Sequence, residues 1–328
     1  MATRVICYGL GPIGQGIARL ALTRPGIEIV GAIDVDPAKL GRDLGTLLGG
    51  AAIGVVVGDT IGALAAANPD VVLHATGSAL PRVISQFTDI MQIGADIVST
   101  CEELSYPWTA QPQLAAELDA AARRAGVTVL GTGVNPGYAM DALPLMLTAP
   151  CAAVDAVRVL RVVDAARRRG PLQKKVGAGL TPEQFAAQVA SGSVRHVGLP
   201  ESLHMLATSL GWQLDSTDDL IEPVIAEHEI TTEFAHVLPG HVAGVRQVAS
   251  GIRGGKEVLR LELQMYVGAA NPQDTIEIDG NPPIRMTIDG GLHGDVATAA
   301  MVVNAIPSVA RAVPGLASMA DAPLVHFW

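Results

Sequence analysis

A glycine-rich segment near the N-terminus is the feature that most constrains the fold of this chain. The apolar run Val5–Tyr8 leads directly into Gly9-Leu10-Gly11-Pro12-Ile13-Gly14, and a helix-forming stretch follows at once. This order predicts a strand, a tight turn and the N-terminus of a helix. In that geometry Gly9 supplies the turn, Gly11 lets the backbone approach a pyrophosphate, and Gly14 lets helix and strand pack closely.

The next predicted strand indicates what this turn would bind. Residues 27–33 are apolar and end at Asp34, about twenty residues past the last glycine, where an acid can accept a hydrogen bond from a ribose 2′-hydroxyl. Asp34 therefore favours NAD over NADP, although Lys39 and Arg42 lie close enough downstream to leave the use of both cofactors open. A plain glycine turn is the alternative, but an acid in register with strand, turn and helix favours a dinucleotide. The expected contacts in the turn are Gly9, Gly11, Pro12, Ile13 and Gly14.

The composition and net charge of the chain narrow the kinds of protein to which it can belong. At 328 residues with 49% apolar content, the chain suits two domains with a large core. The net charge of −10 opposes a nucleic-acid partner, and the basic run Arg167-Arg168-Arg169 with Lys174-Lys175 is expected to be a solvated loop. Cys7, Cys101 and Cys151 form no metal-binding spacing and no even disulfide set, which indicates reduced thiols. Without a signal peptide or membrane-spanning run, we expect a cytoplasmic protein that binds no membrane.

The hydrophobic pattern predicts two architectures in succession. Up to about residue 130, short apolar strands at 55–57, 71–74, 97–99 and 127–130 alternate with helices such as 113–124. This alternation predicts an α/β dinucleotide-binding domain over residues 1–137, built on a Rossmann-type, doubly wound parallel sheet.

After residue 137 the pattern changes to longer alternating strands. The clearest are residues 154–163 and 259–267, with helices expected at 181–191 and 200–210. They predict a second, α+β domain on an open mixed sheet over residues 138–290. A helix over residues 295–305, ended by Pro307, needs an apolar surface to cover. We therefore expect residues 291–328 to form a helical segment that returns to the first domain.

The loops that follow the strands are where a ligand of such a sheet would lie. Thr76-Gly77-Ser78 could lie against the nicotinamide ribose, and an ordinary polar turn is the equal alternative. In the loop after the sixth strand, Asn135 followed by Pro136 predicts a helix N-cap with proline at the first helical position. Capping explains Gly131 and Gly133 less well, so we expect a ligand close to that backbone.

Glu102 and Glu103 raise the sharpest chemical question. Thr100-x-x-Glu103 matches a capping box, in which Glu103 turns back to the backbone N–H of Thr100. That arrangement leaves the chemical role to Glu102, whose carboxylate could hold an ammonium ion and move protons near neutral pH. From the spacing alone, two exposed glutamates at a helix N-terminus are the more ordinary interpretation. Tyr138 and His196 are substrate-pocket candidates on aromatic or titratable character only.

Five segments together resemble one family of enzymes. They are residues 9–14, 99–107, 130–137, 197–202 and 242–247. The chain resembles the 2,4-diaminopentanoate dehydrogenases and native amine dehydrogenases, and the Glu-Glu-Leu and Gly-Thr-Gly-Val-Asn-Pro-Gly elements carry the specificity of the match. The resemblance implies a dihydrodipicolinate-reductase-like architecture, with a second domain that holds the substrate and forms a homodimer. It also implies NAD(P)-dependent, reversible deamination of an amine, or reductive amination of a carbonyl compound with ammonia.

The resemblance also implies roles for individual residues. One glutamate of the pair handles ammonia, and we assign Glu102, with Glu103 as the alternative. Asn304 could face the nicotinamide, although a polar residue ahead of a proline at a helix end is the simpler explanation. The expected cofactor contacts outside the glycine turn are Asp34, Thr76, Gly77, Ser78, Asn135 and Asn304. Alternatives are an amino-acid substrate, a dehydrogenase of the homoserine or saccharopine type, and a nucleotide sensor without turnover.

Overall fold

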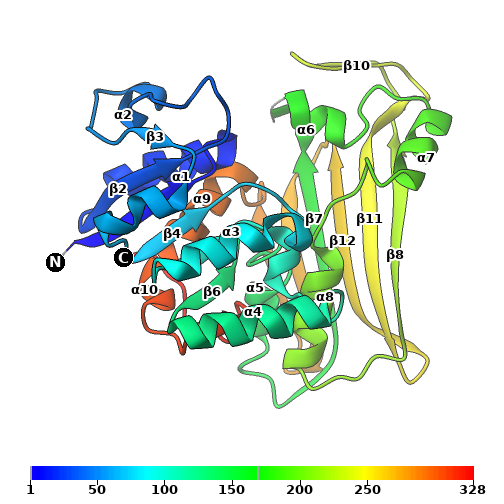
Figure 1. Cartoon of the computed structure of the whole chain (residues 1–328). Coiled ribbons are helices and arrows are strands. Elements are labelled where there is room, and N and C mark those ends of the chain that lie inside the picture. The colour runs from blue at the N-terminus through cyan, green and yellow to red at the C-terminus, as the bar shows by residue number, and fades with distance from the viewer. Residues whose placement is uncertain (1, 168–169) are drawn as a thin grey trace. The chain divides into compact units, whose positions relative to one another are not determined.

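The computed structural model describes residues 2–167 and 170–328, so Arg168 and Arg169 of the basic run lie outside the described residues. The chain divides into two compact units (Figure 1). One unit contains the residues up to Tyr138 together with His293–Trp328, and the other contains Ala139–Leu292. Within the described ranges, none of the helices combines the length and the apolar character needed to cross a membrane.

The first unit is built on a seven-stranded sheet with the order β15-β6-β5-β4-β1-β2-β3. Its strands are β1 (Thr3–Tyr8), β2 (Ile27–Ile33), β3 (Val57–Gly58), β4 (Val71–His74), β5 (Asp96–Ser99), β6 (Thr128–Gly131) and β15 (Gly315–Ala317). Every neighbouring pair is parallel, which confirms the predicted Rossmann-type sheet. The strand expected at 55–57 is reduced to Val57–Gly58, because at this sheet edge Val57 is buried whereas Val56 is 58% exposed.

Helices bury both faces of this sheet. The helical segments are α1 (Pro12–Thr23), α2 (Leu44–Leu47), η1 (Ile61–Ala67), α3 (Leu80–Gln92), η2 (Glu102–Ser105), α4 (Pro112–Ala125), α9 (Gly294–Asn304) and α10 (Ile306–Val309). Val5 and Cys7 of β1 belong to one apolar cluster with α1, α9 and α10, whereas Ile6 and Tyr8 belong to another with α3 and α4. The side chains of one strand thus alternate between two layers of helices, as a doubly wound sheet requires.

The C-terminal segment completes the first of these clusters. Val302 and Val303 of α9 are fully buried in it, and a Cβ on Gly16 of α1 would lie 3.9 Å from the Ala299 side chain. Pro307 does not end the helical region outright, because the short helix α10 begins at Ile306 with the proline in its first turn. The core of the first unit is therefore assembled from the two ends of the chain.

The second unit is built on a six-stranded sheet with the order β14-β13-β7-β12-β11-β8, accompanied by the two-stranded ribbon β9-β10. The strands are β7 (Ala153–Asp164), β8 (Ser216–Ile225), β9 (Ile230–Thr231), β10 (His236–Val237), β11 (Val242–Arg253), β12 (Lys256–Tyr266), β13 (Gln273–Asn281) and β14 (Ile284–Asp289). Its helices are α5 (Ala142–Leu147), η3 (Ala165–Arg167), α6 (Gly170–Lys175), α7 (Pro182–Ala190) and α8 (Leu199–Ser209). β7 and β12 are parallel and the other pairs in the large sheet are antiparallel, which confirms the predicted mixed sheet.

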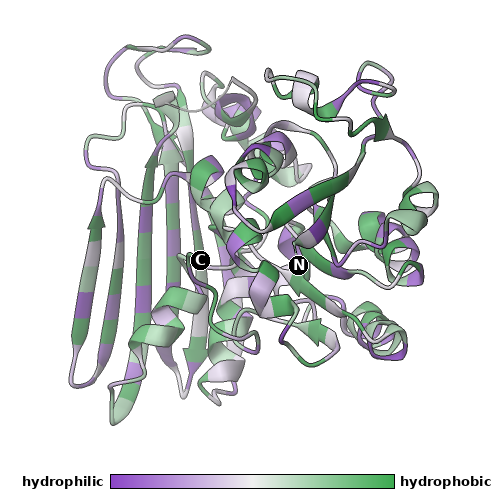
Figure 2. Cartoon of the chain, turned by 90° about the vertical axis from the view of Figure 1, so that its left-hand side faces the viewer, coloured by the Kyte–Doolittle hydropathy of each residue, from purple (hydrophilic) through white to green (hydrophobic). Residues whose placement is uncertain are grey.

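The long strands of this sheet alternate in character. Leu259, Leu261 and Leu263 of β12 are fully buried, whereas Arg260 and Glu262 between them are only half-buried. Figure 2 shows this alternation as successive green and purple bands along the long strands. α8 packs on β11 and β12, so one face of the sheet is a covered apolar face and the other carries charges.

A buried ion pair fixes the point where the chain leaves this unit. Arg161 Nη1 donates to Asp274 Oδ2 at 2.8 Å, and the side chains are 3% and 2% exposed. The N–H of Leu292 donates to the same oxygen at 2.8 Å, and Arg161 Nη2 donates to the Leu292 carbonyl at 2.6 Å. Burial raises the pKa of Asp274 against the opposing effect of Arg161. Removal of one partner would leave an uncompensated charge in the core, so the pair holds Leu292 firmly.

Candidate functional site

The glycine turn lies at the carboxyl end of β1, where the strand order reverses. β2 and β3 follow on one side of β1 and β4 and β5 on the other, and ligands of open α/β sheets bind at such a switch point. Gly9 has a φ of +89°, and a Cβ there would overlap the Ala75 carbonyl. A Cβ on Gly14 would overlap the Gly9 carbonyl oxygen. The packing of the turn itself therefore requires both glycines.

Gly11 differs, because a Cβ there would meet nothing within 4 Å. It is the N-cap of α1, its φ of −65° suits any residue, and no side chain caps the helix. The first N–H groups of a helix have no partner inside it, and Pro12 removes one of them. Open space beside Gly11 and the uncapped start of a twelve-residue helix fit the pyrophosphate of a dinucleotide.

Asp34, directly after β2, braces the same turn. Its Oδ2 accepts from the N–H of Leu10 at 2.7 Å and lies 3.0 Å from Lys39 Nζ, and its Oδ1 accepts from the N–H of Asp36 at 2.8 Å. Burial acts to raise the pKa of Asp34, but the hydrogen bonds from Asp36, Lys39 and Leu10 outweigh it and hold that pKa below its ordinary value. The carboxylate predicted to meet a ribose is thus ionised and already engaged by the protein.

The loop after β4 lies next to the glycine turn. The N–H of Ala75 donates to the Tyr8 carbonyl at 2.7 Å, and a Cβ on Gly9 would lie 2.9 Å from Thr76 Cγ2. Thr76 and Gly77 are exposed and Ser78 is half-buried. The structure therefore brings Gly9, Asp34 and Thr76 together at one edge of the sheet.

Beneath this loop, His74 is the centre of a buried polar network that sequence reasoning missed. Its Nε2 lies 2.7 Å from Gln86 Oε1, and its Nδ1 lies 2.9 Å from Ser99 Oγ. Because an amide oxygen only accepts, Nε2 carries the proton, and the Ser99 hydroxyl donates to Nδ1. Ser99 Oγ then accepts from the N–H of Cys101 at 3.0 Å. Burial lowers the pKa of His74 to about 4, so the ring stays neutral and links the ends of β4 and β5 to α3.

The Glu102-Glu103 pair starts the short turn η2, and the predicted capping box is wrong. The N-cap residue is Cys101, and Glu103 Oε2 accepts from the N–H of Leu80 at 2.8 Å, so Glu103 caps α3 instead of its own turn. The physical reason is that Ala79, the N-cap of α3, has no side-chain acceptor. The N–H of Glu103 also donates to the Ser78 carbonyl at 3.1 Å. Glu102, half-buried, is therefore held on a turn fastened to the loop that borders the glycine turn.

The helix N-cap predicted at Asn135 is also wrong. The Asn135–Pro136 peptide bond is cis, and the next helix begins only at Ala142, whose N–H donates to Asp141 Oδ1 at 2.6 Å. Gly137 has a φ of +117°, and a Cβ there would overlap the N atom of Gly133. The chain therefore folds back on itself where the local pattern predicted a helix.

At the neighbouring glycines, Gly131 and Gly133, other parts of the protein's own backbone occupy the space that a side chain would need. A Cβ on Gly131 would lie 2.6 Å from the carbonyl carbon of Leu104, and one on Gly133 would lie 3.1 Å from the Pro136 carbonyl oxygen. The glycines are therefore explained by packing within the protein, and they no longer indicate a ligand close to this backbone. Gly131 instead lets the η2 turn pack directly on β6.

Asn304 lies away from the glycine turn. Its Oδ1 accepts from Arg24 Nη2 at 2.8 Å, just past the C-terminal end of α1, and a helix of this length spans about 18 Å. Ala299 lies near Gly16 and Asn304 near Arg24, so α9 runs in the same direction as α1 and its beginning lies near the turn. There Thr298 Oγ1 accepts from the N–H of Val134 at 3.3 Å. An expected contact between Asn304 and a nicotinamide does not fit this placement, and Thr298 is the α9 residue that sequence reasoning missed.

The two substrate candidates lie in different units. Tyr138 is the last residue of the first segment of the first unit and is half-buried. His196 belongs to the second unit, where its N–H donates to Gln247 Oε1 at 2.8 Å and its carbonyl accepts from Gln247 Nε2 at 3.2 Å. Gln247 is fully buried, so it fixes the backbone of the His196 loop. Their roles toward a substrate stay predictions.

We next considered whether the described side chains could provide a reactive thiol or a metal site. Burial raises the pKa of Cys7 and of Cys101 to about 12, which keeps both thiols protonated. Within residues 2–167 and 170–328, no three His, Cys, Asp or Glu side chains gather in a way that could hold a metal ion.

Comparison with known proteins identifies the family. A family model described as the 2,4-diaminopentanoate dehydrogenase C-terminal domain matches residues 138–328. A curated 2,4-diaminopentanoate dehydrogenase from Acetoanaerobium sticklandii is 31% identical over 334 residues, which cover 98% of this chain and 93% of that relative. The chain belongs to the 2,4-diaminopentanoate dehydrogenase family. The resemblance inferred from the sequence is thereby confirmed.

Three further proteins resemble this member of the 2,4-diaminopentanoate dehydrogenase family. An amine dehydrogenase from Streptomyces virginiae is 25% identical, with 97% of this chain and 96% of that protein covered. The solved structure of an amine dehydrogenase from Mycobacterium smegmatis matches with a TM-score of 0.87 and 27% identity, covering 100% of this chain and 98% of that one. A dihydrodipicolinate reductase from Paenisporosarcina sp. TG-14 matches at a TM-score of 0.53 and 13% identity over 97% of this chain and 98% of that one, a likeness of fold.

Gly11 and Gly14 form a matched pair for testing the turn. Gly14→Ala should lower the melting temperature by several degrees, because its Cβ overlaps the Gly9 carbonyl. Gly11→Ala should leave the melting temperature nearly unchanged yet weaken dinucleotide binding at least ~10-fold, a loss of about 1.4 kcal/mol. Thermal melts and titration of NADH fluorescence measure the two effects. Tight dinucleotide binding by Gly11→Ala would contradict the placement of a pyrophosphate beside this residue.

The neutral His74 should make stability depend on pH. The unfolded chain takes up a proton at His74 below pH ~6.5, whereas the folded protein does so only near pH 4, so the free energy of unfolding should fall by about 3 kcal/mol between these values. Urea unfolding from pH 7 to pH 4.5 should show a smaller decrease for His74→Gln than for the wild-type protein. His228→Gln, a change at an exposed histidine, is the control and should retain the wild-type decrease. Identical slopes for all three proteins would refute the effect.

Proposed function

We propose that this chain is an NAD(P)-dependent amine dehydrogenase, which interconverts an amine with a carbonyl compound and ammonia. The observation that carries the proposal is the fastening of the Glu102 turn to the nucleotide edge of the sheet. The Glu103 side chain accepts from the Leu80 N–H and the Glu103 N–H donates to the Ser78 carbonyl, so the turn that carries Glu102 is fastened to the loop that borders the glycine turn. The names of the relatives from Acetoanaerobium sticklandii and Streptomyces virginiae support the same chemistry.

The residues at the switch point fit a nicotinamide dinucleotide. When bound, this cofactor supplies or accepts the hydride. Gly11, Pro12 and Ile13 would line its pyrophosphate at the start of α1, while Gly9 and Gly14 shape the turn. Asp34 favours NAD, and Thr76, Gly77 and Ser78 would border the nicotinamide end.

Glu102 would handle the protons of the reaction. In the reductive direction its carboxylate holds an ammonium ion and takes one proton from it, so that the ammonia nitrogen can attack the carbonyl carbon. The same carboxyl group then returns the proton to the carbinolamine hydroxyl, which leaves as water and forms an iminium ion. That iminium carbon is the atom that accepts the hydride. Such a proton shuttle requires a positioned acid–base group, and the fastening of the η2 turn supports Glu102 in that role.

A homodimer through the second unit is part of this proposal. On the charged face of the six-stranded sheet, Glu262 accepts from Arg246 Nε at 2.7 Å and from Arg260 Nη2 at 3.0 Å. Leu220 of β8 lies on the same face and is 52% exposed. A face that mixes half-buried ion pairs with exposed apolar side chains suits contact with a second copy of the chain. In a two-fold symmetric dimer, the same face of each copy forms the interface.

The deciding assay is oxidation of NADH or NADPH with a panel of aldehydes, ketones and 2-oxo acids at mildly alkaline pH, with and without ammonium. We expect oxidation only when ammonium is present, because the carbinolamine forms from ammonia. Comparison of the carbonyl compounds would show whether the substrate carries a carboxylate. Oxidation without ammonium would instead indicate a dehydrogenase that acts on a hydroxyl group.

Glu102→Gln should reduce the ammonium-dependent turnover at least ~10²-fold, because the amide retains the shape but loses the acid–base function. Dissociation constants for NADH, measured by fluorescence, should stay within about two-fold of the wild-type values. Glu103→Gln is the matched control, since it changes the same charge at a residue that caps α3. A larger loss of turnover in Glu103→Gln than in Glu102→Gln would reverse the assignment of the two glutamates.

A further inference from the structure

The imidazole ring of His74, the last residue of β4, is held in one orientation by aromatic neighbours. The side chain is fully buried, and its ring makes edge contacts with the rings of Tyr8 and Phe87, at centroid distances of 5.4 and 4.8 Å. A buried polar atom without a hydrogen bond costs free energy, so each ring nitrogen needs a partner. Packing thus fixes the ring, and the ring can fix the groups that bind its two nitrogens.

The Nε2 side of the ring holds the side chain of Thr76. Gln86 Oε1, from α3, accepts from His74 Nε2 at 2.7 Å and from Thr76 Oγ1 at 2.7 Å, and Thr76 Oγ1 also lies 2.9 Å from Nε2. The hydroxyl proton of Thr76 is therefore used within the protein, which leaves its oxygen as an acceptor for a ligand. Thr76 is exposed and lies against the glycine turn, so this acceptor is held at the nucleotide edge of the sheet.

The Nδ1 side of the ring holds the start of the turn that carries Glu102. The Ser99 hydroxyl donates to Nδ1 at 2.9 Å, and its oxygen accepts from the N–H of Cys101 at 3.0 Å. Cys101 is the N-cap of η2 and directly precedes Glu102. Ser99 is fully buried, so its hydroxyl is confined to these two partners. Two hydrogen bonds therefore connect the ring to the residue before Glu102.

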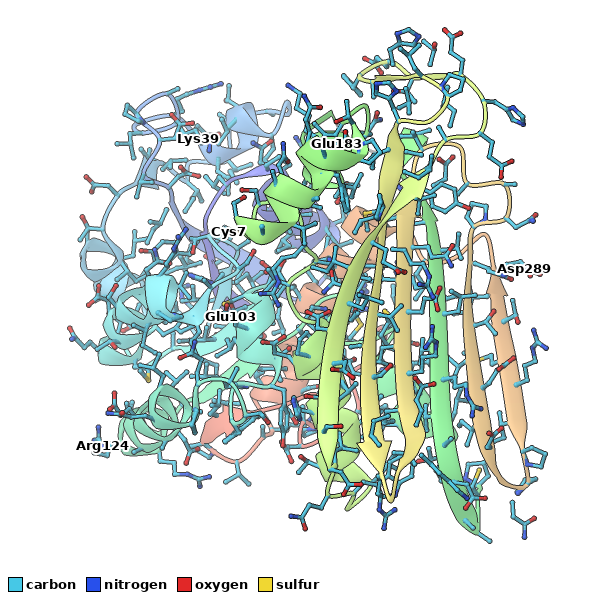
Figure 3. The ribbon with its side chains drawn as sticks, turned by 90° about the vertical axis from the view of Figure 1, so that its right-hand side faces the viewer. Cys7, Lys39, Glu103, Arg124, Glu183 and Asp289 are labelled. Atoms are coloured by element: carbon cyan, nitrogen blue, oxygen red, sulfur yellow. The ribbon has the colours of Figure 1, made fainter. Side chains whose placement is uncertain are left out.

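The helix α3 closes these contacts into one frame. Glu103, which Figure 3 labels in the first unit, accepts from the N–H of Leu80 at the first residue of α3. Gln86, six residues later on the same helix, binds His74. The η2 turn is thus joined to α3 at the start of the helix and, through the ring, at Gln86. A displaced ring would disturb the loop after β4 and the η2 turn together.

We propose that His74 is a positioning residue with two separable tasks: Nε2 fixes the side chain of Thr76, and Nδ1 fixes the turn that carries Glu102. The inference rests on the proposed function, in which Thr76 borders the nicotinamide and Glu102 moves the protons. His74 is fully buried, so it acts through these neighbours and is not itself a catalytic residue. The two tasks concern different steps, since Thr76 serves binding of the cofactor and Glu102 serves turnover.

Two amide substitutions separate the tasks, because the amides of Gln and Asn replace different nitrogens of histidine. His74→Gln can place an N–H donor at the position of Nε2 but no acceptor at that of Nδ1, whereas His74→Asn does the reverse. His74→Gln should reduce kcat of the ammonium-dependent reaction at least ~10-fold, because a small misplacement of a reacting group is costly. His74→Asn should instead weaken NADH binding about 5-fold, the loss expected for one hydrogen bond, with a smaller decrease of kcat at saturating NADH.

The same division should appear when the partners are changed and the histidine is retained. Ser99→Ala removes the hydroxyl that joins Nδ1 to η2 and should reproduce His74→Gln. Gln86→Met keeps the shape of the side chain, removes the acceptor of Nε2 and should reproduce His74→Asn. Gln92→Met, at an exposed residue at the end of α3, is the matched control and should leave kcat and the dissociation constant for NADH at wild-type values.

A double variant tests whether His74 and Ser99 act as one unit. Both single changes break the same hydrogen bond, so His74→Gln combined with Ser99→Ala should reduce kcat no further than the larger single effect. Melting temperatures identify any variant that fails to fold. Gln86 is only half-buried, so Gln86→Met keeps the test decisive even if a change at a fully buried residue unfolds the protein.

Three outcomes would overturn the inference. Wild-type NADH binding by Gln86→Met would refute the task of Nε2, and wild-type kcat in Ser99→Ala would refute that of Nδ1. Parallel losses of binding and kcat in every variant, in step with the melting temperature, would mean that His74 only stabilises the fold. Absence of ammonium-dependent turnover in the wild type would refute the proposed function and with it the task of Nδ1, whereas NADH titration of Gln86→Met would still decide the task of Nε2.

Discussion

The backbone packing of Gly14 on the carbonyl of Gly9 is the contact on which the nucleotide edge of the first unit depends. Because neither residue has a Cβ, α1 can begin directly above the end of β1 and direct its uncapped N–H groups toward the switch point of the sheet. The same closeness places Gly9 against Ala75 and Thr76 of the neighbouring loop. A single steric condition thus aligns the helix terminus with the two loops beside it.

Hydrogen bonds to backbone groups then hold the loops at this edge. Asp34 binds the N–H of Leu10, Glu103 binds the N–H of Leu80, and Ser99 binds the N–H of Cys101. The bonds of Asp34 and Glu103 each join two separate segments of the chain, and the bond of Ser99 holds the start of the loop after β5. The edge is therefore cross-linked. Rigid support of this kind would let a side chain on the η2 turn keep one position, which the acid–base role proposed for Glu102 requires.

The first unit is completed from the far end of the chain. α9 covers the face of the sheet that α1 also covers, and Thr298 reaches the loop after β6. Arg24 at the end of α1 binds Asn304, donates to the carbonyl of Trp328 and lies 4.0 Å from the Phe327 ring centroid. The helix that carries the nucleotide turn is consequently packed against residues that are synthesised last.

Features that depend on near neighbours in the chain follow from the order of the residues alone. Short apolar runs specified β4, β5 and β6, the Thr181 capping box with Gln184 specified the start of α7, and glycine spacing specified the nucleotide turn. The partners of polar side chains, in contrast, depend on contacts between distant parts of the chain. Glu103 caps a helix 23 residues earlier, and Asn304 meets an arginine 280 residues away, distances over which local rules carry no information. A hydrogen bond goes to whichever donor the fold brings nearest, and the fold is set by burial of apolar surface along the whole chain.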